Sequence, residues 1–274
     1  MNLKMIGFTV ACVLLCLSSF AQTDSLRHKK HKKRHFVFGL GMNYFNLKDD
    51  AMSPVRYTGS SFVFNLGTQK ETSKWLSRVD FSLNAGALRS MYYEETERGK
   101  TLNLRMDLAY SRLQKIKTLG KSNVEWLLGG SVDTQAALRL HNQLDNSSGV
   151  YDSFTSLSAS TAFRKSFEWK KRQFQFSYQA SIPFVTVVLR PSFNGLFNFV
   201  DPESDFFQEN LDRHGFASFG SYFRLNNRYE LAYWTRGGQN QIRLGYQWDI
   251  LRYQKLHQLV MAKHQFYLSS LFYF

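Results

Sequence analysis

Polar and apolar residues alternate along most of this chain. Between Thr101 and Tyr110, every even-numbered position holds leucine, methionine or tyrosine, whereas Asn103, Arg105 and Asp107 occupy odd-numbered positions. Successive side chains of a β-strand point to opposite faces of its sheet, so a period of two is typical of a strand with one apolar and one polar face. The pattern therefore predicts a strand in this segment.

Ten segments show this alternation, and no amphipathic helix of comparable length is indicated. The chain holds four prolines, and Pro183 is the one that interrupts an expected strand. Because proline lacks the N–H that a strand interior needs, we expect a bend or bulge there. The expected strands are residues 36–47, 57–69, 75–90, 100–114, 123–139, 150–167, 172–189, 225–235, 240–250 and 262–274.

Two architectures accommodate such strands. A soluble β-sandwich buries the apolar faces and exposes the polar ones, whereas a membrane barrel turns its apolar face to lipid and its polar face to the lumen. The segments are longer than the ~5–6 residues of soluble strands and reach the ~9–11 that cross a bilayer. Aromatic residues also gather near the strand ends, as in aromatic girdles. We therefore predict an all-β fold, a transmembrane, antiparallel up-and-down β-barrel of about ten strands, within a range of about eight to twelve.

Short and long connections alternate between the expected strands. Membrane barrels have short periplasmic turns and longer outer loops, so both ends of the barrel domain, residues 36–274, should lie on the periplasmic side. The longest connection, residues 190–224, would be an extracellular loop. The alternative is a further pair of strands there, but Pro191 and Pro202 favour a loop. Short connections are expected at 70–74, 115–122, 168–171 and 236–239, and longer ones at 48–56, 91–99, 140–149, 190–224 and 251–261.

Residues 1–21 are typical of a cleaved signal peptide. Lys4 precedes an apolar run over residues 6–17, and the small residues Ser19 and Ala21 have the spacing of a cleavage site. The apolar run is too short for a transmembrane helix. We therefore expect the mature chain to be exported.

The charge and the cysteine content of the sequence limit the kinds of partner and site that an exported chain can have. Cys12 and Cys16 both lie in the signal peptide, so the mature chain has no disulfide and no thiolate metal site. The net charge is +14, and basic residues are concentrated in residues 27–35. Anionic lipid or cell-wall polymer is the accessible partner for this run, rather than nucleic acid. Residues 22–35 are expected to form a basic periplasmic tail. The alternative is that these residues are a solvated segment that binds no partner. No cofactor or metal is expected.

The polar faces of the expected strands carry charges of both signs. A charged group that faced lipid at mid-bilayer would cost about 2–4 kcal/mol, so these residues should face the lumen. In a narrow barrel the interior is just wide enough for side chains, and buried charges generally occur in pairs. An ion-pair network that plugs the lumen is favoured over a lining that conducts small polar solutes. The expected inward residues are Arg78, Asp80, Asn84, Arg105, Asp107, Glu125, Glu230, Arg243 and Gln247.

The final segment has apolar or aromatic residues at alternate positions. The chain ends on Phe274, preceded by Phe272, Leu268 and Phe266, and only Ser270 departs from the pattern. This ending resembles the C-terminal signature of bacterial (Gram-negative) outer-membrane β-barrel proteins. The resemblance covers the last strand, the signal peptide and the general alternation, and it assigns no subfamily. It implies outer-membrane lipids and the barrel-assembly machinery as partners, and the cell outer membrane as the location.

The other face of the last strand should point into the lumen. Its polar members are Lys263, Gln265 and Ser269. Its remaining members, Tyr267, Leu271 and Tyr273, are apolar or aromatic. Such residues favour a packed floor over an open channel mouth.

Two enzymatic alternatives have weaker support. Omptin proteases use acidic and histidine side chains near the extracellular rim, but no omptin motif matches the residues of these types here, Asp201, Asp205, Asp212 and His214. Residues 141–149 hold the His and Ser of outer-membrane phospholipases at the wrong spacing, and His264 has the outward parity of an aromatic belt. We therefore expect a barrel that is not an enzyme, with a structural or interaction role and a largely plugged lumen. A narrow pore for small polar solutes is the second interpretation, and an outer-membrane hydrolase is the third.

Removal of Phe274 should impair membrane insertion, because the resemblance assigns this residue to the assembly signal. Outer-membrane fractionation and heat-modifiable migration on denaturing gels measure the folded, inserted fraction. Normal insertion of the shortened chain would count against the barrel interpretation as a whole.

Overall fold

The structure is a computed structural model that describes residues 33–91, 100–119, 124–141, 149–190, 214–235, 240–255 and 257–273. Within these ranges the regular elements are eleven β-strands, and no helix is long and apolar enough to span a membrane. The strands are β1 (Lys33–Asp49), β2 (Ser53–Glu71), β3 (Trp75–Ser90), β4 (Lys100–Leu119), β5 (Val124–His141), β6 (Gly149–Trp169), β7 (Arg172–Leu189), β8 (His214–Ala217), β9 (Tyr222–Trp234), β10 (Gln241–Tyr253) and β11 (Leu259–Tyr273).

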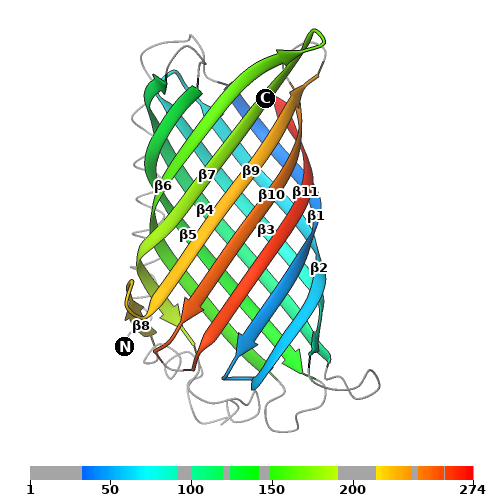
Figure 1. Cartoon of the computed structure of the whole chain (residues 1–274), viewed down its shortest axis with the longest axis vertical. Coiled ribbons are helices and arrows are strands. Elements are labelled where there is room, and N and C mark those ends of the chain that lie inside the picture. The colour runs from blue at the N-terminus through cyan, green and yellow to red at the C-terminus, as the bar shows by residue number, and fades with distance from the viewer. Residues whose placement is uncertain are drawn as a thin grey trace, which may run out of the picture.

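Ten of the strands close into an antiparallel barrel (Figure 1). Each strand pairs with its neighbour along the chain, and β11 pairs with β1 to complete the ring. The remaining strand, β8, pairs only with the last four residues of β7, beyond the part of β7 that pairs with β9. The predicted all-β, ten-stranded barrel is therefore confirmed.

The polarity of the wall is the reverse of that in a soluble protein. On β1, Leu40 and Met42 are 56% and 52% exposed on the outer face, whereas the side chain of Asn43 is only 1% exposed. Every strand of the ring carries at least one large exposed apolar side chain. Apolar side chains thus point outward and polar side chains point into the lumen, as the alternation predicts.

Pro183 lies at a β-bulge, as expected. Leu157 of β6 faces Val185, and Ser158 faces Pro183, so Phe184 has no partner between them. Phe184 and Val185 are consequently both exposed on the outer wall. The bulge places the missing N–H of proline where the ladder of hydrogen bonds is already interrupted.

Several strands extend beyond their expected ends. β1 begins at Lys33, so the expected tail loses its last three residues to the barrel. These residues pair with the backbone of β2 from Gln69 to Glu71, and backbone pairing does not depend on the polarity of the side chains. The expected long connection 48–56 shrinks to residues 50–52 for the same reason.

The range expected as one long loop, residues 190–224, also contains strand structure. β8 occupies residues 214–217, and β9 begins at Tyr222. β7 is longer than its pairing with β9 requires, and its free end takes β8 as a partner. Residues 191–213 lie outside the described ranges.

Tyr267 lies across the inner wall, over glycines on both neighbouring strands. A Cβ atom built on Gly245 of β10 would stand 2.0 Å from the Cζ atom of Tyr267, and one built on Gly41 of β1 would stand 2.8 Å from its Cβ atom. The Tyr267 hydroxyl donates a hydrogen bond to Oε1 of Glu230 at 2.7 Å. The two glycines therefore make room for a ring that reaches into the lumen.

Replacing Gly245 with alanine should lower the free energy of unfolding by about 1–3 kcal/mol, because the new methyl group displaces the Tyr267 ring. Urea unfolding of the folded protein in detergent, followed by the heat-modifiable gel shift, measures this change. Gly130→Ala is the matched control, since its methyl group would meet nothing closer than the Ser158 carbonyl oxygen at 3.4 Å. Equal unfolding midpoints for the two variants would contradict this packing.

Candidate functional site: an ion-paired lumen

Charged side chains from all parts of the ring meet inside the barrel. Nine acidic and ten basic side chains of the described residues form ion pairs there, so the net charge of this set is +1. The acidic members are Asp49, Glu71, Asp80, Asp107, Glu125, Asp133, Asp152, Glu230 and Asp249. The basic members are Arg78, Arg105, Lys115, Arg139, Arg164, Arg190, Arg224, Arg228, Arg243 and Lys263.

One ion pair joins opposite walls of the barrel. Arg78 on β3 donates two parallel hydrogen bonds to Glu230 on β9, at 3.0 and 2.8 Å. These strands lie five places apart in the ring of ten, so the pair spans the full width of the lumen. Arg243 contacts the same carboxylate at 3.2 Å, and Arg228 donates to Asp80 at 2.8 Å. Such bidentate, charge-assisted bonds are strong and fix the geometry of both partners.

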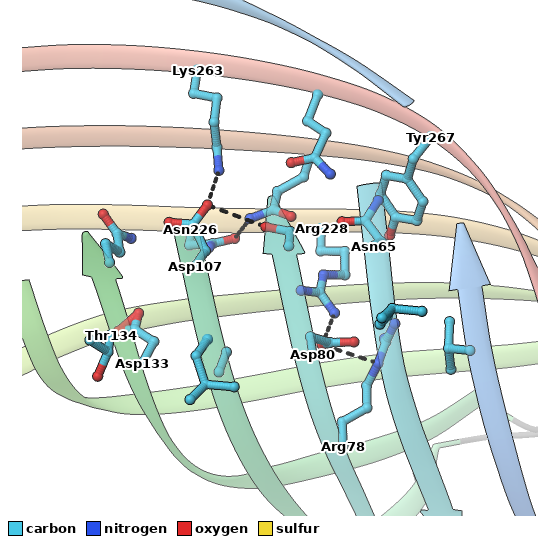
Figure 2. A pocket seen from close by; sticks show the side chains of 18 of the residues that line it. Asn65, Arg78, Asp80, Asp107, Asp133, Thr134, Asn226, Arg228, Lys263 and Tyr267 are labelled. Carbon is cyan, nitrogen blue, oxygen red and sulfur yellow. Dashed lines mark hydrogen bonds and ion pairs between the residues drawn. The ribbon is translucent and has the colours of Figure 1, made fainter. Parts of the chain in front are cut away.

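A second group of ion pairs lies nearer the long-loop end. Arg224 on β9 donates two hydrogen bonds to Asp249, at 2.8 and 2.9 Å, and a third to Asp133 on β5. Figure 2 shows Lys263 of β11 pointing toward Asp107 of β4, with 3.4 Å between the charged atoms. The contacts of Arg224 with Asp133 and of Lys263 with Asp107 join strands that are not neighbours, so the middle of the lumen is bridged at a second level.

The long-loop end is closed by an ion-pair cluster and an apolar cluster. Asp49 accepts hydrogen bonds from Arg190 and from Arg139, the latter at 2.9 Å, and Arg139 also donates to Asp152 at 2.6 Å. Beside them lie fifteen buried apolar side chains: Phe45, Leu47, Ala51, Met52, Tyr57, Leu88, Val150, Phe154, Val188, Ala217, Tyr222, Leu251, Tyr253, Leu259 and Met261. This end of the lumen is therefore filled by buried ion pairs together with a packed apolar core.

The short-turn end has a smaller closure. Arg164 contacts Glu71 at 2.8 Å and Glu125 at 2.6 Å, and Lys115 contacts the same two carboxylates at 3.1 and 3.2 Å. Both carboxylates are partly exposed, so water reaches this cluster. A small apolar group beside it consists of Leu76, Leu113, Leu127 and Ala162.

A small cavity remains between the two middle levels. Its volume is about 80 Å³, and it is lined by charged and amide side chains that include Asp80, Asp107, Asp133, Arg228 and Lys263 (Figure 2). One water molecule needs about 10–15 Å³ of space open to its centre. The cavity therefore has room for several water molecules between charges that are already paired.

The structure places the seven charged residues of the predicted lumen network on the inner wall, and each takes part in an ion pair. Asn84 donates to the backbone of Arg105 at 3.3 Å, and Gln247 donates to Asn226 at 3.2 Å. Several partners were missed. Arg190 and Arg224 lie in the range expected as a loop, whereas Arg228 and Asp249 have inward parity that a strand-by-strand count would have found.

The last strand follows its expected parity. Phe266, Leu268 and Phe272 are exposed on the outer wall, and Phe274 lies outside the described residues. Tyr267 and Leu271 are buried in the lumen, as expected. Tyr273 also keeps its expected inward parity: its ring lies 5.9 Å from that of the buried His35, and it is 48% exposed because the strand ends there, at the rim of the barrel.

The residues of the enzymatic alternatives are only partly described. His141 is buried, and its Nε2 atom lies 3.2 Å from the Tyr57 hydroxyl, while residues 142–148 lie outside the described ranges. His264 lies on the outer wall, with its Nδ1 atom 2.7 Å from the Tyr246 hydroxyl. His214 begins β8, and Asp201, Asp205 and Asp212 lie outside the described ranges. The described residues hold no group of side chains that could bind a metal ion.

Replacing Glu230 with glutamine should lower the free energy of unfolding by about 3–5 kcal/mol, because it leaves two buried guanidinium groups without their carboxylate. Urea unfolding in detergent measures the loss. Glu168→Gln, at an exposed position of β6, makes the same chemical change and should stay within about 0.5 kcal/mol of the wild type. Similar stabilities for the two variants would mean that the ion pairs do not hold the barrel together.

Solved barrel structures show the same general arrangement at very low sequence identity. The outer membrane protease OmpT from Escherichia coli is 6% identical, with 92% of this chain and 100% of that chain covered and a TM-score of 0.47. The COG4313 outer membrane channel from Pseudomonas putida F1 is 10% identical, with 92% and 98% covered and a TM-score of 0.34. The translocator domain of autotransporter NalP from Neisseria meningitidis is 7% identical, with 98% of each chain covered and a TM-score of 0.34. Similarities this distant carry no argument about function.

Sequence comparison gives a family but no activity. None of the curated proteins matches the chain. Residues 8–267 match the family described as "Protein of unknown function (DUF3316)". The match covers nearly the whole chain, and this protein is therefore a member of the DUF3316 family.

Proposed function

We propose that this protein is an integral outer-membrane β-barrel with a structural or interaction role, whose lumen is closed by its own side chains. The observation that carries the proposal is the ion pair between Arg78 and Glu230, which joins opposite walls of the ring. Further ion pairs lie on both sides of it along the barrel axis, and an apolar cluster fills the long-loop end. A solute would have to displace all of these contacts in turn.

The outer wall supports the membrane location. Large apolar side chains are exposed on every strand of the ring, which in water would form an apolar surface far larger than soluble monomers expose. In a bilayer the same surface is favourable, and only charged groups there are costly, at about 2–4 kcal/mol each near the midplane. Together with the expected signal peptide, this wall supports placement in the outer membrane.

The charge balance favours a plug over a pore. Pores that select ions carry rings of one sign, whereas here ten cations and nine anions of the described residues are paired with one another. Breaking a buried pair on one side costs about 3–5 kcal/mol. A narrow pore for small polar solutes is the second candidate, and the cavity of about 80 Å³ in the middle of the lumen is the feature that favours it.

We propose no enzymatic activity for this protein. A role as an outer-membrane hydrolase is the third candidate, after the plugged barrel and the narrow pore. The proposed partners are the lipids of the outer membrane and the barrel-assembly machinery. The basic segment 27–35 is proposed to contact anionic lipid or cell-wall polymer. Its last residues, Arg34 and His35, are paired with β2, so this contact would form next to the rim of the barrel.

Purified protein reconstituted into planar bilayers should give no stable single-channel current, because the lumen is bridged at several levels. Phe154→Ala, which opens a gap in the apolar cluster at the long-loop end, should also give none, since the ion pairs below remain. A large, stable conductance of the wild type would overturn the plug and favour the pore. Conductance that appears only in Phe154→Ala would show that the apolar cluster is the single gate.

A further inference from the structure

The hairpin formed by β6 and β7 projects beyond the rim of the barrel. Residues 165–173 are exposed on both faces, whereas Arg164, the next inward residue, is buried. In Figure 1 the tip of this hairpin extends past the neighbouring strands, at the end of the barrel where the C-terminus is marked. This is the end with the short turns. The tip therefore has no lumen to line, and its side chains are free to meet the surroundings.

The outer face of the hairpin carries a cluster of aromatic rings. Phe167 stacks on Phe174 with 5.7 Å between ring centroids, and Trp169 lies 6.1 Å from the same ring. Tyr233 of β9 continues the cluster at 5.4 Å from Phe174. Trp169 is 60% exposed. Rings of this kind lie at the level of lipid headgroups in membrane proteins.

Four cations surround these rings. Lys165 and Arg172 share the outer face with the aromatic cluster, and Lys170 and Lys171 form the tip. The Nζ atom of Lys170 lies 5.1 Å from the centroid of Trp169, and the guanidinium carbon of Arg172 lies 5.8 Å from that of Tyr233. Residues 165–173 contain one acidic residue, Glu168, which has inward parity. The outer face of the tip is therefore strongly positive.

The backbone conformation of the tip indicates that Lys170 and Lys171 have a role beyond forming the turn. Lys170 and Lys171 have φ angles of 50° and 62°, and they are the only non-glycine residues with positive φ in the described part of the chain. A two-residue hairpin turn of this type needs positive φ at both positions, and it favours Asn-Gly. Lysine adopts this conformation at a cost in free energy. Strain of this kind is typical of functional positions, and here it retains two positive charges.

From these observations we propose that the tip of the β6–β7 hairpin binds the headgroups of anionic phospholipids in the membrane leaflet at the short-turn end of the barrel. The inference rests on the proposed insertion into a membrane. Lys170, Lys171 and Arg172 at the tip would contact the lipid phosphate, while Phe167 and Trp169 lie in the apolar layer directly beneath it. A soluble anionic polymer would satisfy the charges but would leave these rings in water, so the shared face favours a bilayer lipid.

The double variant Lys170→Asn and Lys171→Gly tests this site, because it removes two charges and supplies the residues that the turn favours. Native mass spectrometry of the full-length protein in detergent, with equimolar phosphatidylglycerol and phosphatidylcholine, measures the ratio of the two bound lipids. The wild type should prefer phosphatidylglycerol, and this preference should fall roughly 25-fold in the variant, about fivefold for each removed charge. Its unfolding temperature should be unchanged or higher, whereas a purely structural role of the lysines would leave the lipid ratio unchanged.

The matched control removes two exposed charges at the opposite end of the barrel, in the double variant Arg89→Gln and Lys100→Gln. These residues are register partners on β3 and β4, and their removal should leave the lipid ratio as in the wild type. An unchanged ratio in the hairpin variant, an equal loss in both variants, or full displacement of the lipid by soluble glycerol phosphate would each overturn the inference. Failure of the wild type to insert into any bilayer would count against the proposed function instead.

Discussion

The neutralisation of charge inside a narrow lumen is the constraint on which this structure depends. A charged side chain on the wall of a membrane barrel cannot face lipid without a large cost, so it must point inward. Inside a ring of ten strands it meets the opposite wall rather than bulk water. Each inward charge therefore needs a partner, and Arg78 finds its partner, Glu230, on the far side of the ring. The pairs that satisfy the charges also hold the walls at a fixed separation.

The same constraint explains how the apolar side chains are distributed within the lumen. The middle of the barrel holds charge pairs, while the main apolar core lies at the long-loop end. Inward positions near that end belong to strand ends and short turns, such as Ala51 and Met52, and they can converge over the mouth of the barrel. In the middle, where the walls are parallel, room for a large ring requires glycine, as at Gly245 beneath Tyr267. Closure by packing thus occurs mainly at the long-loop end, whereas ion pairs lie along the whole length of the lumen.

The alternation of the sequence was enough to predict the fold, because a period of two fixes which face of each strand is polar. It also placed Arg105 and Arg243 on the inner wall, since both lie well inside strands. It could not give the pairs, because a contact such as that of Lys263 with Asp107 depends on the order of strands around the ring and on their stagger. Arg224 was missed because β9 begins inside a segment whose prolines and acidic residues suggest a loop, and Arg190 because it directly follows the last residue of β7 and precedes Pro191.

The proposed closure of the lumen would transfer recognition to the rims and the outer wall. Since the interior charges satisfy one another, they exert little attraction on a passing solute, and specificity must come from groups that the barrel leaves unpaired. The β6–β7 hairpin meets this condition: β6 is the longest of the described strands, it continues past the last inward ion pair at Arg164, and the one acidic residue of its tip, Glu168, has inward parity. The length of a strand beyond the ion-paired section therefore decides whether its charges stabilise the barrel or remain available to a partner.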